Sequence, residues 1–309
     1  MAETHIADSQ FLWMDGQFVP YADAKIHVLS HSLHYGSAVF EGLRAYATPK
    51  GPAIFRPQEH FERFLDSIRV MGYSIPYSAQ DLTRISHELI IRNGFKACYI
   101  RPVAYIDDSV RGLKLPKVPQ VHTAIAVWSW GKYMGDEGHL RGVKVKTSTF
   151  RRADVSSSLP LAKISGAYVT SVLARREATL EGFDEAILLD PHGFVAEGSG
   201  ENVFMVKKGE IITPAVGYLL PGITRDCVIE IAKHLGLSLR QENITRNQLY
   251  VADEVFFTGT AVEITPVKEI DHHLIGKESP GPITQKIKET FFKCTLGQQD
   301  NFKSWVSFS

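Results

Sequence analysis

Apolar residues occur along the first part of the chain in short runs that predict strands. Residues 11–14 and 17–20 are two such runs, and they flank Asp15-Gly16, a pair typical of a tight hairpin turn. Further strands are expected at residues 38–48, 53–56, 98–106 and 121–130. The first part of the chain is therefore predicted to be rich in local strand pairing.

Two helices are predicted between these strands. After Pro57 the apolar residues recur at helical spacing until Gly72, a residue typical of a helix end. Ser78 and Asp81 have the spacing of a capping box, which predicts a second helix over residues 78–93. Residues 1–130 are therefore expected to form a small α+β domain.

The second part of the chain has longer helical patterns separated by apolar runs. Helices are expected at residues 168–180, 223–235 and 283–296, and strands at residues 143–149, 185–189, 202–207 and 254–258. The intervening segment 131–142 is rich in glycine and polar residues, which is typical of a linker. We expect an interdomain linker at 131–142 and a large α/β domain at 143–309.

Composition and charge narrow the classes of function. The 309 residues include 34 Lys+Arg and 34 Asp+Glu, so the formal net charge is zero. Nucleic-acid binding and binding to an anionic membrane both favour a basic surplus, so neither kind of partner is expected. The three cysteines form no Cys-x-x-Cys pair, and the N-terminal segment carries Glu3 and Asp8 without an apolar run. We expect a cytoplasmic protein without disulfides.

Lys163 and Glu197 are candidates for chemistry. No acidic residue lies within eight positions of Lys163 on either side. A lysine buried without a partner loses its proton readily and becomes a nucleophile, although a surface lysine before a helix would have the same sequence. Glu197 lies among small residues after a predicted strand, where it could pair with a cation or simply occupy a turn.

Two segments have the character of anion sites. The run 220–225 (LPGITR) opens a predicted helix, and N–H groups at a helix start bind phosphate well. Residues 258–261 (TGTA) end a strand in a tight turn that could offer further N–H donors. His31 and His34 have metal-like spacing but no obvious third ligand, so a structural role is expected and no metal site is predicted. An activated lysine, an acid and phosphate donors together are what pyridoxal phosphate requires.

Seven motifs in order along residues 10–300 resemble the branched-chain amino acid aminotransferases of fold type IV. They are HYGSAVFEGLRAY (34–46), HFERF (60–64), YIRP (99–102), AKISGAY (162–168), EGSGEN (197–202), LPGITRD (220–226) and ADEVFFTGTAVEITPV (252–267). The resemblance implies a two-domain α/β (α+β) enzyme that binds pyridoxal 5′-phosphate in the interdomain cleft.

The resemblance also implies a role for individual residues. Lys163, in the large domain, resembles the Schiff-base lysine, and Glu197 resembles the carboxylate beside the pyridine nitrogen. The other cofactor-binding positions it implies are Arg63, Tyr168, Ile223, Thr224 and Thr260. The substrate-binding positions it implies are Tyr35, Phe40, Tyr99, Arg101, Trp130, Tyr133 and Ala261. Residues 107–119 match the family's variable pocket loop.

The implied reaction transfers the amino group of leucine, isoleucine or valine to 2-oxoglutarate, giving a branched 2-oxo acid and glutamate. The implied assembly is a homodimer or a higher homo-oligomer. Three activities of the same fold remain as alternatives: D-amino acid aminotransferase, aminodeoxychorismate lyase and (R)-amine transaminase. A non-enzymatic carrier of a phosphorylated ligand would also explain the two anion segments but would not require Lys163.

Overall fold

A computed structural model describes residues 9–131 and 133–308 of the chain. The chain divides into two compact units. Unit 1 comprises Met1–Trp130, Ala162–Ala167 and Cys294–Ser309, and unit 2 comprises Gly131–Leu161 and Tyr168–Lys293. Each unit contains its own β-sheet with helices, so the expected α/β (α+β) class is confirmed.

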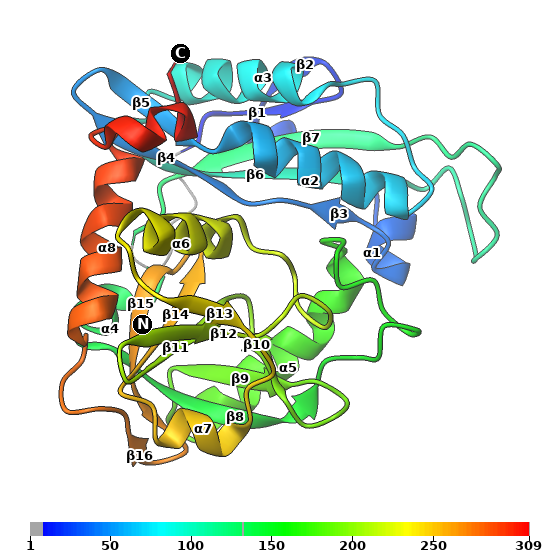
Figure 1. Ribbon diagram of the computed structural model, residues 1–309. Helices are drawn as coiled ribbons and strands as arrows, with labels where there is room; N and C mark the ends of the chain where they lie inside the picture. The colour runs from blue at the N-terminus through cyan, green and yellow to red at the C-terminus, as the bar shows by residue number, and fades with distance from the viewer. Residues whose placement is uncertain (1–8, 132, 309) are drawn as a thin grey trace. The chain divides into compact units, whose positions relative to one another are not determined.

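Unit 1 contains an antiparallel sheet in the order β17-β5-β4-β6-β7-β1-β2, with β3 paired to β6. Helices α2 and α3 lie along this sheet (Figure 1). The strands are β1 (Phe11–Met14), β2 (Gln17–Pro20), β3 (Val39–Phe40), β4 (Leu43–Thr48), β5 (Gly51–Phe55), β6 (Cys98–Tyr105), β7 (His122–Trp128) and β17 (Val306–Phe308). The helices are α1 (His31–Tyr35), α2 (Pro57–Val70) and α3 (Ala79–Arg92).

The core of unit 1 lies between the two helices and the sheet. Phe61, Phe64 and Ile68 of α2 are buried, as the helical spacing predicts, and they pack with Leu82 and Ile100. Pro57 occupies the first turn of α2, and Ser78 and Asp81 form the expected capping box of α3. Local sequence therefore sets where both helices begin.

One predicted strand is broken in the structure. Residues 38–48 form β3 and β4, which are separated at Glu41 and Gly42. Both short strands pair with β6, but the Glu41 side chain is completely buried and accepts hydrogen bonds from α2. The break thus coincides with a buried charged side chain, which an apolar pattern does not reveal.

Unit 2 contains a mixed sheet in the order β10-β9-β8-β15-β14-β11-β12-β13, with β16 paired to β15. Helix α5 packs against β8 and β9. The strands are β8 (Val143–Arg151), β9 (Glu185–Leu189), β10 (Val195–Gly198), β11 (Asn202–Lys207), β12 (Glu210–Thr213), β13 (Leu239–Gln241), β14 (Glu254–Gly259), β15 (Glu263–Ile270) and β16 (His273–Leu274). The helices are α4 (Gly135–Arg141), α5 (Tyr168–Leu180), α6 (Ile223–His234), α7 (Arg246–Tyr250) and α8 (Pro282–Thr295), whose last two residues belong to unit 1.

The units differ from the expected domain division at three segments. Residues 131–142, expected as a linker, contain α4 and belong to unit 2. Residues 162–167, with Lys163, and residues 294–309 belong to unit 1 instead of the large domain. The reason is that both segments hydrogen-bond to unit 1, at β3 and at β5. In the described part of the chain, no helix is long and apolar enough to cross a membrane.

Candidate functional site

The segment that carries Lys163 is held against residues 36–40 of unit 1 by backbone hydrogen bonds. The N–H of Phe40 donates to the carbonyl of Lys163 at 3.0 Å, and the N–H of Ser165 donates to Ala38 at 2.8 Å. The N–H of Lys163 itself donates to the hydroxyl of Ser67 on α2 at 3.0 Å. The lysine backbone is thus attached to both the sheet and a helix, which limits its motion.

Two glycines allow this close approach. The N–H of Gly166 donates to the carbonyl of Gly36 at 2.9 Å. A Cβ atom on Gly36 would lie 2.8 Å from the Cα of Gly166, and Gly36 also has a positive φ of 64°. Any larger side chain at either position would push the lysine segment away from residues 36–40.

Arg63, a predicted phosphate ligand, is joined to a buried carboxylate. Its Nε donates to Oε1 of Glu41 at 2.6 Å, and its Nη2 donates to Oε2 at 3.0 Å. Nδ1 of His60, one turn earlier on α2, donates to the same Oε2 at 2.9 Å. The carboxylate therefore holds the guanidinium group in a fixed orientation through a two-point contact.

The ionisation of this cluster follows from its surroundings. Burial raises the pKa of the Glu41 carboxyl, but the charge of Arg63 and the hydrogen bond from His60 outweigh burial and hold that pKa far below its usual range. Burial lowers the pKa of the His60 imidazole, and Glu41 offsets this only in part. Glu41 is consequently an anion and His60 a neutral donor at neutral pH.

Arg101 on β6 is surrounded by aromatic rings. Its Cζ lies 5.0 Å from the ring centre of Phe40, 5.2 Å from that of Tyr99 and 5.7 Å from that of Trp128. Its Nη2 donates to the hydroxyl of Tyr99 at 3.3 Å. Among the residues that the structure describes, no carboxylate pairs with Arg101, and its buried Nε has no hydrogen-bond partner. A structural ion pair, the other role open to an arginine on a strand, is therefore not observed there.

The Phe40 ring lies close to the side-chain amine of Lys163 and to the guanidinium group of Arg101. Nζ of Lys163 is 4.9 Å from its centre, and Cζ of Arg101 is 5.0 Å from it. The ring of Tyr99 makes an edge-to-face contact with that of Trp130, with the ring centres 4.5 Å apart. Unit 1 thus gathers the predicted lysine and four predicted substrate positions in one region. Tyr35 lies at the end of α1 and is half exposed, with its ring 4.7 Å from that of His31.

Glu197 on β10 of unit 2 is paired with a cation, as the sequence allowed. Nε of Arg152 lies 2.9 Å from its Oε1. The N–H of Leu220 and the amide of Asn202 donate to Oε2 at 3.2 and 3.3 Å. Arg152 is itself held by Ser171 and by the carbonyls of Gly198 and Ser199. This set of donors favours an anionic carboxylate in a fixed orientation.

The other predicted positions of unit 2 lie at the ends of its elements. Ile223 and Thr224 open α6, whose N-cap is Gly222, so no side chain caps that end of the helix. A Cβ atom on Gly222 would lie 2.0 Å from Oδ1 of Asn202, so this approach requires glycine. The remaining positions are at the start of α5 (Tyr168), after β14 (Thr260 and Ala261) and before α4 (Tyr133).

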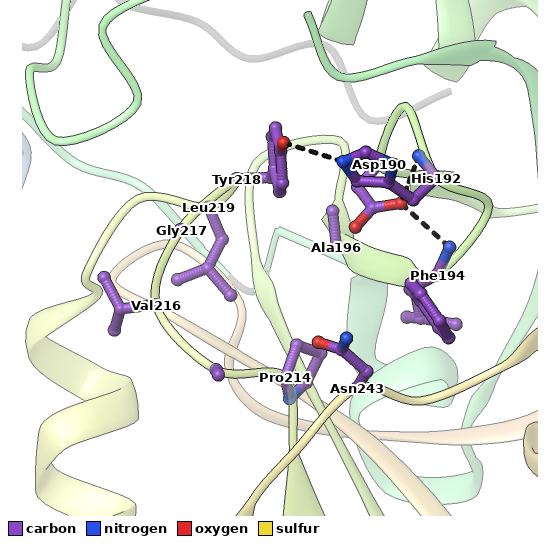
Figure 2. A pocket seen from close by; sticks show the side chains of 12 residues that line it. Asp190, His192, Phe194, Ala196, Pro214, Val216, Gly217, Tyr218, Leu219 and Asn243 are labelled. Carbon is purple, nitrogen blue, oxygen red and sulfur yellow. Dashed lines mark hydrogen bonds between the residues drawn. The ribbon is translucent and has the colours of Figure 1, made fainter. Parts of the chain in front are cut away.

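A pocket of about 180 Å³ in unit 2 contains none of the predicted residues. Phe194, Pro214 and Leu219 form apolar walls, and His192 hydrogen-bonds Tyr218 at 3.1 Å at its edge (Figure 2). Ala196 in its lining is the neighbour of Glu197. The pocket thus borders the strand that carries Glu197 without including that carboxylate.

Several residues of these clusters were missed by the sequence analysis. Glu41 and His60 lie inside motifs that the resemblance rests on, and Trp128 lies two positions from Trp130. Arg152 lies 45 positions from Glu197, so only the fold reveals their contact. His31 and His34 do have structural contacts. Nδ1 of His31 bonds Ser37 at 2.8 Å, and Nε2 of His34 bonds the carbonyl of Val28 at 2.9 Å.

Comparison with known proteins decides the family. The family model described as amino-transferase class IV matches residues 38–270. The chain belongs to this family. It is 46% identical over 294 residues to the branched-chain-amino-acid aminotransferase of Pseudomonas aeruginosa, covering 95% of each chain.

Solved structures of branched-chain amino acid aminotransferases match both units. The Escherichia coli enzyme superposes with a TM-score of 0.95 at 38% identity, covering 97% of this chain and 99% of that one. The enzyme of Thermoproteus uzoniensis, solved with norvaline, has a TM-score of 0.92 at 43% identity and covers 97% and 99%. A third such enzyme, solved with pyridoxamine 5′-phosphate, has a TM-score of 0.93 at 45% identity and covers 97% and 98%.

Replacing Glu41 by Gln should lower the free energy of unfolding at pH 7 by about 3–5 kcal/mol, because it removes the anion of a buried pair. The folded pKa of Glu41 lies below the unfolded value, so its stabilisation is complete above that unfolded value, about 4.3, and is lost as the pH falls from there toward the folded pKa. Denaturant unfolding of both proteins between pH 7 and pH 3 measures this.

The matched control is Glu62→Gln, which neutralises an exposed carboxylate on the same helix. The stability difference between wild type and Glu41→Gln should narrow with falling pH, whereas Glu62→Gln should stay close to wild type throughout. A difference that does not change with pH would contradict an ionised Glu41.

Proposed function

We propose that the protein is a pyridoxal-phosphate-dependent aminotransferase that transfers the amino group of leucine, isoleucine or valine to 2-oxoglutarate. The observation that carries this proposal is the position of Phe40, whose ring lies within 5.0 Å of both Lys163 Nζ and Arg101 Cζ. A reactive amine and an anion-binding group beside one apolar ring suit a substrate with a reacting amino group and either an apolar or an acidic side chain. The identity of 46% to a branched-chain enzyme supports the same function.

The residues present fit the cofactor. The uncapped start of α6 at Gly222 offers backbone N–H donors to a phosphate, with Ile223 and Thr224 in its first turn. Oγ1 of Thr258 is buried without a hydrogen-bond partner among the described residues, close in sequence to Thr260. Arg63 supplies a cation for the phosphate, Tyr168 a hydroxyl for the ring oxygen, and Glu197 an anion for the ring nitrogen.

When bound, pyridoxal phosphate supplies an electron sink for charge that develops at the substrate Cα. The amine of Lys163 would remove the Cα proton as a general base and would then deliver it, as a general acid, to the C4′ carbon of the cofactor. The Glu197 carboxylate, oriented by Arg152 and the Leu220 N–H, holds a proton on the ring nitrogen. Glu41 holds the guanidinium of Arg63 in place for the phosphate.

The substrate side chain meets a mixed surface in unit 1. Phe40, Tyr99 and Trp130 supply apolar rings for a branched chain, while Arg101 supplies a cation for the distal carboxylate of glutamate or 2-oxoglutarate. Tyr35 of unit 1 is also proposed to bind the substrate. Tyr133 and Ala261 are the substrate-binding residues proposed in unit 2. The aromatic rings and Arg101 of unit 1 would then accept the side chains of both substrates of the two half-reactions.

We also propose that the enzyme is a cytoplasmic homo-oligomer. Val28 and Leu33 before and within α1 are 69% and 60% exposed, and Val172 on α5 is 64% exposed. Apolar side chains gathered on short segments favour burial against another subunit. The three cysteines are buried and form no disulfide, which suits a reducing compartment.

Replacing Lys163 by Ala should reduce transamination to background, because no other group supplies both the covalent attachment and the proton transfer. Borohydride treatment of the holoenzyme should leave cofactor attached to wild type but not to the variant, as measured by mass spectrometry. Lys233→Ala, at an exposed position on α6, is the control and should be trapped like wild type. Trapping that persists without Lys163 would exclude it as the attachment site.

A substrate panel separates the proposed reaction from other activities of the fold. L-Leucine, L-isoleucine and L-valine, each added alone, should convert the aldehyde form of the cofactor to the amine form, as followed by absorbance. D-Alanine and an (R)-amine should react far more slowly, because the rings of unit 1 and Arg101 are proposed to bind the side chains of branched and acidic L-amino acids. Faster conversion by D-alanine or the (R)-amine would favour the corresponding alternative activity.

Replacing Arg101 by Ala should cost the glutamate half-reaction about 2–5 kcal/mol in kcat/KM, because the distal carboxylate is left without its cation. The leucine half-reaction should change far less, since leucine has no distal charge. Single-turnover rates with L-glutamate and L-leucine on wild type and variant measure the two effects separately. Equal losses for both amino acids would rule out the carboxylate role of Arg101.

A further inference from the structure

Trp128 and Arg101 lie on the same face of the sheet of unit 1. In the ladder between β6 and β7, Tyr99 is paired with Trp128 and Arg101 is paired with Ala126. Alternate residues of a strand point to the same face, so Trp128 and Ala126 share the face that carries Tyr99 and Arg101. Ala126 is too short to reach the guanidinium group, and the next side chain on that face is the indole of Trp128.

The rings around Arg101 also contact one another. The centroids of Tyr99 and Trp128 are 5.0 Å apart, and those of Trp128 and Trp130 are 5.6 Å apart. Trp128 is half-buried and Tyr99 is buried, so this aromatic group has little freedom to move. Trp128 was not among the residues that the sequence indicated.

A guanidinium group that lies over aromatic faces keeps its N–H donors in its own plane. The rings stabilise the cation through its faces, and the indole of tryptophan has the strongest such interaction. The edge of the group remains able to bind a carboxylate at two points. The absence of a carboxylate partner among the described residues is consistent with this arrangement.

We propose that Trp128 is a positioning residue that holds the Arg101 guanidinium for a distal carboxylate, and so sets how strongly the site favours acidic over branched substrates. This inference rests on the proposed function of Arg101 and adds a residue that determines specificity. Without the indole, Arg101 would sample more conformations, and its ordering would have to occur on binding. A dicarboxylate should therefore lose affinity when Trp128 is replaced, while an apolar monocarboxylate should not.

The test measures binding of two probes to the holoenzyme by calorimetry. Glutarate carries the distal carboxylate, and 4-methylpentanoate carries a branched apolar end instead. We expect Trp128→Leu to raise the Kd of glutarate by about 2- to 30-fold, the range of a cation–π contact, and to change the Kd of 4-methylpentanoate less than twofold. Trp128→Phe keeps an aromatic face, so it should raise the Kd of glutarate by a smaller factor and leave the Kd of 4-methylpentanoate unchanged. If Trp128→Leu does not fold, Trp128→Phe tests the proposal by itself.

A double-mutant cycle with Arg101→Ala separates this proposal from the proposed function. In the Arg101→Ala background, Trp128→Leu should have no further effect on glutarate. A full effect in that background, equal losses for both probes, or unchanged glutarate binding in both Trp128 variants would each overturn the role of Trp128. If Arg101→Ala by itself leaves glutarate binding unchanged, the carboxylate role of Arg101 fails and the inference fails with it.

Discussion

The backbone pairing between residues 163–166 and residues 36–40 is the constraint on which the site in unit 1 depends. It attaches Lys163 to a segment that is distant in sequence, and it requires glycine at positions 36 and 166 because their backbones nearly touch. The same segment carries Phe40, whose ring lies beside Lys163 Nζ and Arg101. Displacing this pairing would move the amine and one wall of the substrate region together.

Buried carboxylates organise the charges in both units. Glu41 in unit 1 orients Arg63, and Arg152 in unit 2 orients Glu197. Taking these groups out of water is costly, so each carboxylate is retained with several donors that satisfy its oxygens. Arg63 and Glu197 are the residues proposed to contact the cofactor. Each is held by a partner, Glu41 or Arg152, that is not proposed to contact it, and this fixes the orientation of the contacting side chain before any ligand binds.

The sequence predicted some elements better than others. Helices α2 and α3 follow from apolar spacing, a proline in the first turn and the capping box at Ser78, which are all local signals. Strands β10, β12 and β15 were not predicted, because they are short or lie next to motifs that were interpreted as turns. The change of unit at residues 162–167 could not be predicted, since it depends on hydrogen bonds to residues more than 100 positions away.

The sequence by itself determined the α/β class and the family, because ordered motifs and local periodicity are written along the chain. The roles of individual residues at the site stay predictions. Only the tertiary structure decided which side chains support Arg63, Arg101 and Glu197. Glu41, Trp128 and Arg152 reach those residues through strand register and helix packing. Such contacts join positions far apart in sequence, and no local pattern of hydrophobic and polar residues encodes them.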